Sequence, residues 1–254
     1  MVMGARPLAV LDTIVCGQAE KEIIKSFVKG ISEACRENGC SLVGGETSIQ
    51  PQVVEKGVYI LTSSIAGIIS KEKVIDGSGI TEGDVVLAVA SNGLHTNGYS
   101  LIRMLMEQMP QIKLDKIDGE TFIEQIMKPH TTYRNAILKL LECPGIHGMA
   151  HITGGGIKGN LCRIVPEGLC AEIDLSAIRT LPVFRYLHRI GNIDDAEMLS
   201  TFNCGVGLTV VVSERDAERA LQKIAAYHTC YEIGRIRKGS EKIIFRNVIN
   251  WESA

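Results

Sequence analysis

Several features that mark large functional classes are missing from this sequence of 254 residues. The formal net charge is only −2 and no basic block is present, so electrostatically driven binding to nucleic acid is not expected. No apolar run is long enough to cross a bilayer, and no charged segment followed by an apolar one marks a secretory signal. The eight cysteines form no CxxC pair and no spacing typical of zinc sites, which favours free thiols in a reducing cytoplasm over a disulfide framework.

Three common catalytic motifs are also missing. The sequence has no GxGxxG after a strand, no Walker loop and no GxSxG. It therefore lacks the marks of dinucleotide oxidoreductases, P-loop ATPases and α/β-hydrolases. The 45% of hydrophobic residues is nevertheless enough for one large domain or two modest ones with a real core.

Helical and extended patterns alternate along the whole chain without repeats. Apolar residues recur every three or four positions over 23–35 and predict an amphipathic helix that ends before Gly39. The continuous apolar run 85–90 predicts a buried strand, and the polar, glycine-bearing segment 71–83 is the candidate domain boundary. The fold class expected from this order is α/β, of the α+β type with mixed sheets.

The segment 151–156, His-Ile-Thr-Gly-Gly-Gly, is the one around which the chain is organised. Three glycines remove every Cβ, so that backbone N–H groups can face an anion. A helix over the following apolar run, 161–165, would add unpaired donors and the positive end of its dipole. The alternative is a tight turn beside a histidine whose hydrogen bonds are satisfied.

Two further polar loops are expected at strand ends. Residues 44–47, Gly-Gly-Glu-Thr, follow a short apolar run, and Glu46 is either a ligand of magnesium or of a ribose hydroxyl, or a solvated turn residue. Residues 91–98 lie between a strand and a helix, so His95 is expected to contact a ligand, and Asn97 is a candidate N-cap.

A fourth loop, residues 203–207, brings two glycines into the start of a strand. Glycines at such a place permit close approach of the backbone to a ligand or another strand. Cys204 is interpreted as a packed residue rather than a nucleophile, because no neighbouring feature lowers its pKa. Together the four loops suit a phosphorylated, polar small molecule, but the spacing of the residues does not identify a reaction.

These same segments carry a resemblance. GGET at 44–47, GLHTNGYSL at 93–101, HITGGG at 151–156 and TFNCGVG at 201–207 resemble the phosphoribosylformylglycinamidine cyclo-ligase (aminoimidazole ribonucleotide synthetase) family. The resemblance extends from residue 3 to about residue 246. It implies ATP-dependent ring closure of formylglycinamidine ribonucleotide to aminoimidazole ribonucleotide in purine biosynthesis, with ATP and Mg²⁺ as cofactors. It also implies a cytoplasmic homodimer that binds neither nucleic acid nor membrane.

The resemblance further implies two domains and a set of site residues. Residues 1–75 would be the remainder of an N-terminal nucleotide-binding and dimerisation domain, and residues 76–254 a C-terminal substrate-binding domain. Candidate acid/base or phosphate-stabilising groups are His95 and His151. Candidate cofactor-binding residues are Gly44, Gly45, Glu46 and Thr47, with Glu46 as metal ligand. Candidate substrate-binding residues are Asn97, Thr153, Gly154, Gly155, Gly156 and Asn203.

Two departures from the family pattern keep alternatives open. The family carries an ATP- and metal-binding loop before the point where this chain begins, so the resemblance implies a chain that lacks this N-terminal segment. In addition, Ser48-Ile49-Gln50 stand where the family tends to have Ala-Glu-Met, so one acidic residue is gone. The alternatives are inactivity of the isolated chain, a non-catalytic phosphate- or nucleotide-binding remnant, or another ATP-using enzyme of the superfamily, such as selenophosphate synthetase or thiamine-monophosphate kinase.

Overall fold

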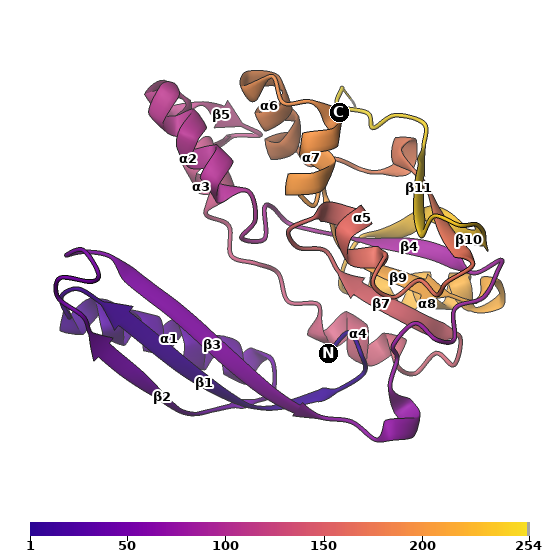
Figure 1. Cartoon of the computed structure of the whole chain (residues 1–254), viewed down its shortest axis with the longest axis horizontal. Coiled ribbons are helices and arrows are strands. Elements are labelled where there is room, and N and C mark those ends of the chain that lie inside the picture. Colours follow the sequence, from indigo (N-terminus) through magenta and orange to yellow (C-terminus); the bar gives the residue numbers. More distant parts are fainter. Residues whose placement is uncertain (253–254) are drawn as a thin grey trace. The chain divides into compact units, whose positions relative to one another are not determined.

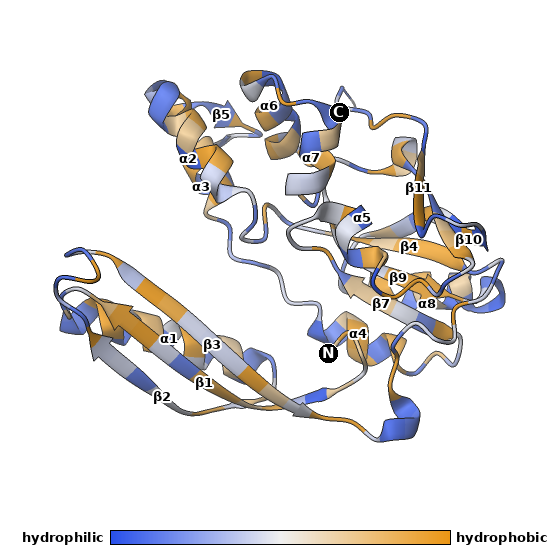
Figure 2. Ribbon diagram, in the orientation of Figure 1, coloured by the Kyte–Doolittle hydropathy of each residue, from blue (hydrophilic) through white to orange (hydrophobic). Residues whose placement is uncertain are grey.

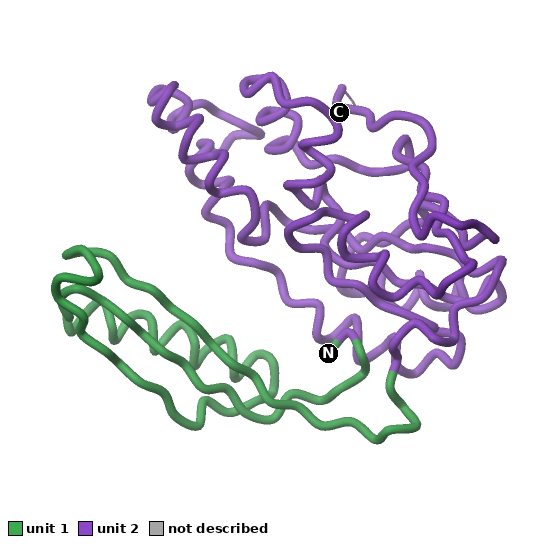
Figure 3. Tube along the Cα trace, viewed as in Figure 1, with its two compact units in different colours: residues 1, 3–74 green, residues 2, 75–254 purple. Residues whose placement is uncertain are grey.

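The computed structural model describes residues 1–252 and divides the chain into two compact units (Figure 3). Unit 1 comprises Met1 and Met3–Val74. Unit 2 comprises Val2 and the described residues from Ile75 onward.

Unit 1 is a three-stranded sheet in the order β2-β1-β3 with one helix packed on it (Figure 1). The central strand β1 (Arg6–Cys16) pairs in parallel with β2 (Ser41–Ile49) and antiparallel with β3 (Tyr59–Ile68). Helix α1 (Lys21–Glu37) joins the two parallel strands, because such strands need a crossover connection. The expected helix is confirmed, and Gly39, with φ +65°, follows its C-terminus.

Unit 2 contains a six-stranded sheet in the order β11-β8-β10-β4-β9-β7. All neighbouring pairs are antiparallel except β11 and β8, so the sheet is mixed, as the fold class predicted. The strands are β4 (Val85–Ala90), β7 (Ile146–His151), β8 (Leu169–Asp174), β9 (Val206–Val212), β10 (Cys230–Lys238) and β11 (Ile243–Arg246). Strand β9 is buried along its whole length, and all its residues but Gly207 and Thr209 are Val or Leu.

Helices cover both faces of this sheet (Figure 1). One face is covered by α4 (Arg134–Leu140) and α8 (Ala217–Ala225). The main core lies on the other face, and Figure 2 shows apolar residues along the helices there. Those helices are α2 (Tyr99–Gln108), α3 (Phe122–Ile126), α5 (Gly156–Leu161), α6 (Pro182–Gly191) and α7 (Asp195–Thr201). The remaining short elements are the hairpin β5 (Lys116–Ile117) and β6 (Glu120–Thr121), and the 3₁₀ turns η1 (Lys71–Lys73), η2 (Pro110–Leu114), η3 (Leu175–Ala177) and η4 (Glu214–Asp216).

The expected loop at residues 44–47 is wrong: all four residues lie inside strand β2. Gly45 pairs with Asp12 of β1, and a Cβ on Gly45 would lie 2.2 Å from Oδ1 of Asp12. The glycine therefore allows a carboxylate to lie against the neighbouring strand, and the backbone needs no turn there.

Two other local expectations are also corrected. The helix expected over 161–165 lies earlier: α5 spans Gly156–Leu161 and begins inside the glycine run. Asn97 is not the N-cap of α2, because Gly98 takes that place with φ 80° and the Asn97 side chain donates to the carbonyl oxygen of His95 at 3.1 Å. Glycine is preferred for such a left-handed conformation because it has no Cβ.

Candidate active site

Three of the predicted loops meet at one end of the sheet in unit 2. Strands β4, β9 and β7 are neighbours, and β9 runs antiparallel to both others. The C-terminal ends of β4 and β7 therefore lie beside the start of β9. This topology brings together residues 91–98, residues 151–156 and residues 203–207, although more than one hundred positions separate the first from the last.

Asn203 connects two of these loops, residues 91–98 and residues 203–207, by hydrogen bonds. Its side chain is fully buried, and its Nδ2 donates to the carbonyl oxygen of Gly93 at 2.9 Å. Its Oδ1 accepts from the Ser91 hydroxyl at 2.9 Å and from the Gly205 N–H at 2.8 Å. Since buried polar groups need such partners, these bonds fix the loop geometry and occupy the amide that was expected to face a substrate.

His95 lies at the centre of this region with only 3% of its surface exposed. Its Nε2 lies 2.6 Å from Oδ1 of Asn92. The orientation of that amide is set by its other contacts, because Nδ2 donates to the Pro129 carbonyl at 2.9 Å and Oδ1 accepts from the Thr131 N–H at 3.3 Å. The Asn92 backbone N–H is also near Nε2, at 3.3 Å, but the contact to Oδ1 is shorter and assigns the proton to Nε2.

The other ring nitrogen of His95, Nδ1, is buried and has no hydrogen-bond partner within residues 1–252. With the proton on Nε2, this nitrogen carries a bare lone pair. The pKa of His95 is lowered to about 3, chiefly by burial and to a lesser extent by the nearby His130 and His151. His95 is therefore a neutral hydrogen-bond acceptor at pH 7.

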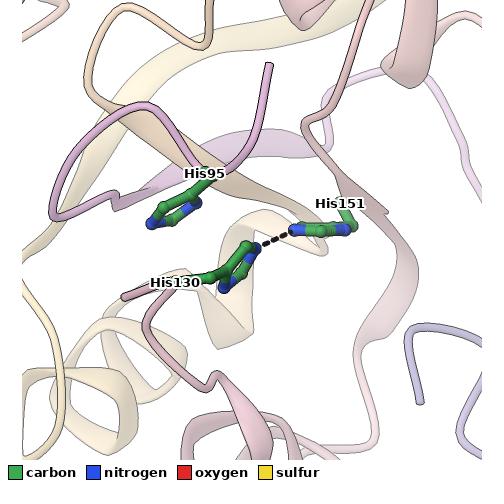
Figure 4. Close-up of side chains that lie close together, drawn as sticks. All are labelled: His95, His130 and His151. Atoms are coloured by element: carbon green, nitrogen blue, oxygen red, sulfur yellow. Dashed lines mark hydrogen bonds between the residues drawn. The ribbon is translucent and has the colours of Figure 1, made fainter. Parts of the chain in front are cut away.

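His130, which the sequence interpretation missed, completes the group (Figure 4). It lies in the segment between α3 and α4, and its ring stacks on that of His95 with centroids 3.9 Å apart. Its Nδ1 lies 2.6 Å from the carbonyl oxygen of Thr131, and its Nε2 lies 3.0 Å from Nε2 of His151. No glycine loop or strand end precedes His130, so the pattern used for the other loops could not find it.

His151 is the last residue of β7 and is half-buried. Burial, followed by the charge of His130, lowers its pKa, so it too favours the neutral form. Tyr133 lies beside the group with its ring centroid 6.0 Å from that of His95, and its hydroxyl donates to the Ala90 carbonyl at 2.9 Å. A Cβ on Gly207 would lie 1.8 Å from the Tyr133 hydroxyl, so the close approach expected from this glycine is to neighbouring side chains.

The glycine loop has fewer free donors than its sequence suggested. The N–H of Gly155 donates to the Ser200 carbonyl at 2.9 Å, and that of Gly156 donates to the Thr153 carbonyl at 3.1 Å. Gly156 is buried, and a Cβ there would lie 1.8 Å from the Leu199 carbonyl oxygen. Gly154 is exposed, and Oδ1 of Asn97 lies 3.5 Å from the position of its Cβ. An anion can therefore reach the loop at Gly154 and Asn97, whereas Gly155 and Gly156 shape the backbone.

Cys204 is packed, as expected. It is 1% exposed, and burial raises the pKa of its thiol to about 12. The thiol donates to the Met198 carbonyl at 3.4 Å and stays protonated at neutral pH, which is the opposite of what a nucleophile requires.

Comparison with known proteins identifies the family. The family model described as "AIR synthase related protein, N-terminal domain" matches residues 1–69, and the corresponding C-terminal domain matches residues 81–246. Phosphoribosylformylglycinamidine cyclo-ligase of Bacillus cytotoxicus is 42% identical over 244 residues, which cover 94% of this chain and 70% of the relative. The protein of the same name from Methylobacillus flagellatus is 44% identical over 238 residues, 93% of this chain and 69% of that relative.

The chain belongs to the phosphoribosylformylglycinamidine cyclo-ligase family. Solved structures with the same fold include the hydrogenase maturation protein HypE of E. coli (TM-score 0.72, 22% identity, 100% of this chain and 76% of that chain). Thiamine-monophosphate kinase from Stenotrophomonas maltophilia is similar as well (TM-score 0.68, 19% identity, 98% of this chain and 75% of that chain). At these identities the likeness concerns the fold alone.

In this cyclo-ligase family member, the other predicted site residues belong to unit 1. Gly44, Gly45, Glu46 and Thr47 follow one another along β2, and all four are exposed. The register of β2 on β1 pairs Glu46 with Thr13 and so places these two residues on the same face of the sheet.

Within the described residues, no helix is long and apolar enough to span a membrane.

Proposed function

We propose that this chain catalyses the ATP-dependent ring closure of formylglycinamidine ribonucleotide to aminoimidazole ribonucleotide. The observation that carries the proposal is the identity of 42% and 44% to two proteins named as this cyclo-ligase, over 93% or more of the chain. The convergence of His95 and His151 at one end of the sheet supports it. The same site would serve a step of purine biosynthesis.

In the proposed reaction, the γ-phosphoryl group of ATP is transferred to the formamide oxygen of the substrate. A nitrogen of the same molecule then attacks the activated carbon, so that a C–N bond forms while the C–O bond to phosphate breaks. The products are the imidazole, ADP and phosphate, and the attacking nitrogen loses a proton. For such a reaction the protein supplies mainly positioning, charge neutralisation and a proton acceptor.

Both histidines can accept a hydrogen bond or a proton, because burial lowers the pKa of both and their imidazoles are neutral at pH 7. A pKa of about 3 makes His95 a weak base, so His151 is the better candidate for the proton acceptor. A neutral imidazole stabilises phosphate charge less well than a cationic one does. Of the two roles expected from the sequence, acid/base chemistry is therefore favoured over phosphate stabilisation.

The proposed contact to the substrate phosphate comes from Asn97, Thr153 and Gly154. Gly154 is exposed beside the Asn97 side chain, and the Thr153 hydroxyl is held by Oδ1 of Asn160 at 3.1 Å. Asn203 is part of the proposed site as a positioning residue, because the hydrogen bonds of its side-chain amide hold residues 91–98 against residues 203–207.

The proposed nucleotide and metal residues are those of β2. Glu46 provides one exposed carboxylate, which fits Mg²⁺ because this ion is usually held by one or two carboxylates together with substrate phosphates. When bound, Mg²⁺ would neutralise charge on the transferred phosphoryl group. Asp12 does not join Glu46, because it is buried and lies on the opposite face of the sheet.

The proposal includes a homodimer in the cytoplasm. The sheet of unit 1 exposes large apolar side chains at Leu11 (53%), Val43 (60%), Ile60 (50%) and Ile65 (64%). Exposed apolar side chains of this kind favour association with a second copy of the chain, which would bury them in the interface. All eight cysteines are free thiols, which is typical of a reducing compartment.

The test is an assay of the aminoimidazole product with this chain, ATP and Mg²⁺. Replacement of His151 by Ala should lower kcat at least about tenfold, because a general base contributes at least that much. The matched control is His188→Ala, at a histidine of α6 whose ring stacks on Trp251, and it should keep parental turnover. Unchanged turnover in both His95→Asn and His151→Ala would remove these residues from the site. Nucleotide binding by titration calorimetry without turnover would favour the non-catalytic alternative.

A further inference from the structure

The histidine cluster (His95, His130 and His151) brings together three imidazoles from three separate segments (Figure 4). One ring nitrogen from each lies within 4.8 Å of the other two. The proposed ring closure assigns no role to His130, so the presence of a third histidine in the cluster is not explained by that reaction.

In two of the three rings, one ring nitrogen carries no proton of its own. The Asn92 contact holds the proton of His95 on Nε2, and Nδ1 is buried without a partner. In the same way, Nδ1 of His130 donates to the Thr131 carbonyl at 2.6 Å, which leaves Nε2 as an acceptor. Such hydrogen bonds on the far nitrogen are how proteins orient histidines that bind metals.

The distance between the second and third rings also fits a shared ion. Nε2 of His130 and Nε2 of His151 lie 3.0 Å apart. Two nitrogens bound to one tetrahedral Zn²⁺ at about 2.0–2.1 Å lie roughly 3.3 Å apart, so a small shift accommodates an ion in place of the shared proton. His151 would then carry its proton on Nδ1.

We propose that His95, His130 and His151 form a three-histidine site for a late divalent transition-metal ion such as Zn²⁺. Imidazole nitrogen suits Zn²⁺, Cu²⁺ and Ni²⁺, whereas Mg²⁺ prefers oxygen ligands. Three protein ligands leave a position open for water or another small ligand.

The site goes beyond the proposed ring closure and does not depend on it. A bound ion would occupy the lone pairs of His95 and His151 that the acid/base role requires. Metal binding is therefore a different use of these two residues. Metal binding and product formation are separate measurements, and either proposal can fail while the other stands.

The test is titration of the purified full chain with Co²⁺, which reports its ligands by visible absorption, followed by competition with Zn²⁺. We expect a single ion per chain, with bands typical of four- or five-coordinate Co²⁺, displaced by Zn²⁺. Thiolate charge-transfer bands should be absent, because the three ligands are nitrogens. Their appearance would assign the ion to cysteines and overturn the proposal.

The deciding variant is His130→Asn, because His130 is exposed and its replacement disturbs no core packing. It should weaken Co²⁺ affinity at least about tenfold, whereas the matched control His188→Asn on α6 should bind as the parent does. Asn92→Leu should weaken affinity about 10- to 100-fold, since Asn92 fixes the tautomer of His95. Equal affinity of His130→Asn and parent, or no binding by the folded parent, would overturn the proposal.

Discussion

At the scale of single residues, the lowered pKa of His95 makes the free energy of unfolding depend on pH. The pKa of His95 is lowered to about 3 in the folded chain, whereas an unfolded histidine titrates near about 6.5. Between these two values the unfolded state binds more protons than the folded state, so the free energy of unfolding falls as the pH falls. His151, whose pKa is also lowered by burial, acts in the same direction.

We therefore predict that acid weakens the parent protein more than a His95→Asn variant. Below about pH 6, the free energy of unfolding of the parent should fall by up to about 1.4 kcal/mol per pH unit more than that of the variant. Asn is the suitable replacement because residue 95 has φ 52°, a left-handed conformation that Asn tolerates. Urea unfolding at several pH values measures the difference, and parallel pH profiles of the two proteins would contradict the assignment of a neutral, buried His95.

At the scale of elements, strand β9 meets Tyr133, the residue before helix α4, at Gly207. A Cβ on this glycine would lie 1.8 Å from the Tyr133 hydroxyl and 2.9 Å from Cε1 of His95. Tyr133 is held in place by its bond to Ala90, so it cannot move aside freely. We predict that Gly207→Ala lowers the free energy of unfolding by about 1–3 kcal/mol, the usual effect of overpacking.

The matched control for Gly207→Ala is Gly159→Ala. Gly159 lies in α5, where a Cβ would meet nothing within 4 Å. Alanine is the better helix former, so this change should leave stability unchanged or raise it by up to about 1 kcal/mol. Chemical unfolding of both variants is the measurement. Equal stability of Gly207→Ala and parent would mean that β9 and Tyr133 are not in close contact.

The elements also show what the sequence could and could not predict. Strand β4 is a continuous apolar run, β9 is rich in Val, and helix α1 has a clear apolar stripe, so the local pattern was sufficient to predict them. Strand β7 contains two histidines and a glycine and has no such pattern, and it forms because it pairs with β9. Hence His151 was expected within a loop segment but ends a strand.

The same reasoning applies to the site. His95 and His151 stand beside glycines at strand ends, a local signal that predicts ligand contact, although their binding roles stay predictions. His130 has no such signal, and only the tertiary fold brings it against His95. The loop expected at Glu46 failed because pairing between β1 and β2 outweighs the local preference of two glycines for a turn.

At the scale of the whole molecule, unit 1 carries large apolar side chains on the surface of its sheet. Leu11 and Ile60 of this sheet are each exposed by half or more of their surface, and exposed apolar patches commonly mark sites of protein–protein interaction. We predict that the parent is a dimer through this sheet and that Leu11→Glu shifts it to a monomer, because a charge buried in an apolar interface is strongly unfavourable. Light scattering coupled to size-exclusion chromatography measures the mass directly.

The control is Leu114→Glu, the same substitution at a leucine of unit 2 that is 77% exposed. Both variants place one carboxylate on an exposed leucine, so a general effect of charge on self-association would appear in both. Loss of the dimer in Leu11→Glu alone would assign the interface to the sheet of unit 1. A parent that is monomeric at assay concentration would instead mean that these side chains remain in water and that the proposed reaction takes place within a single chain.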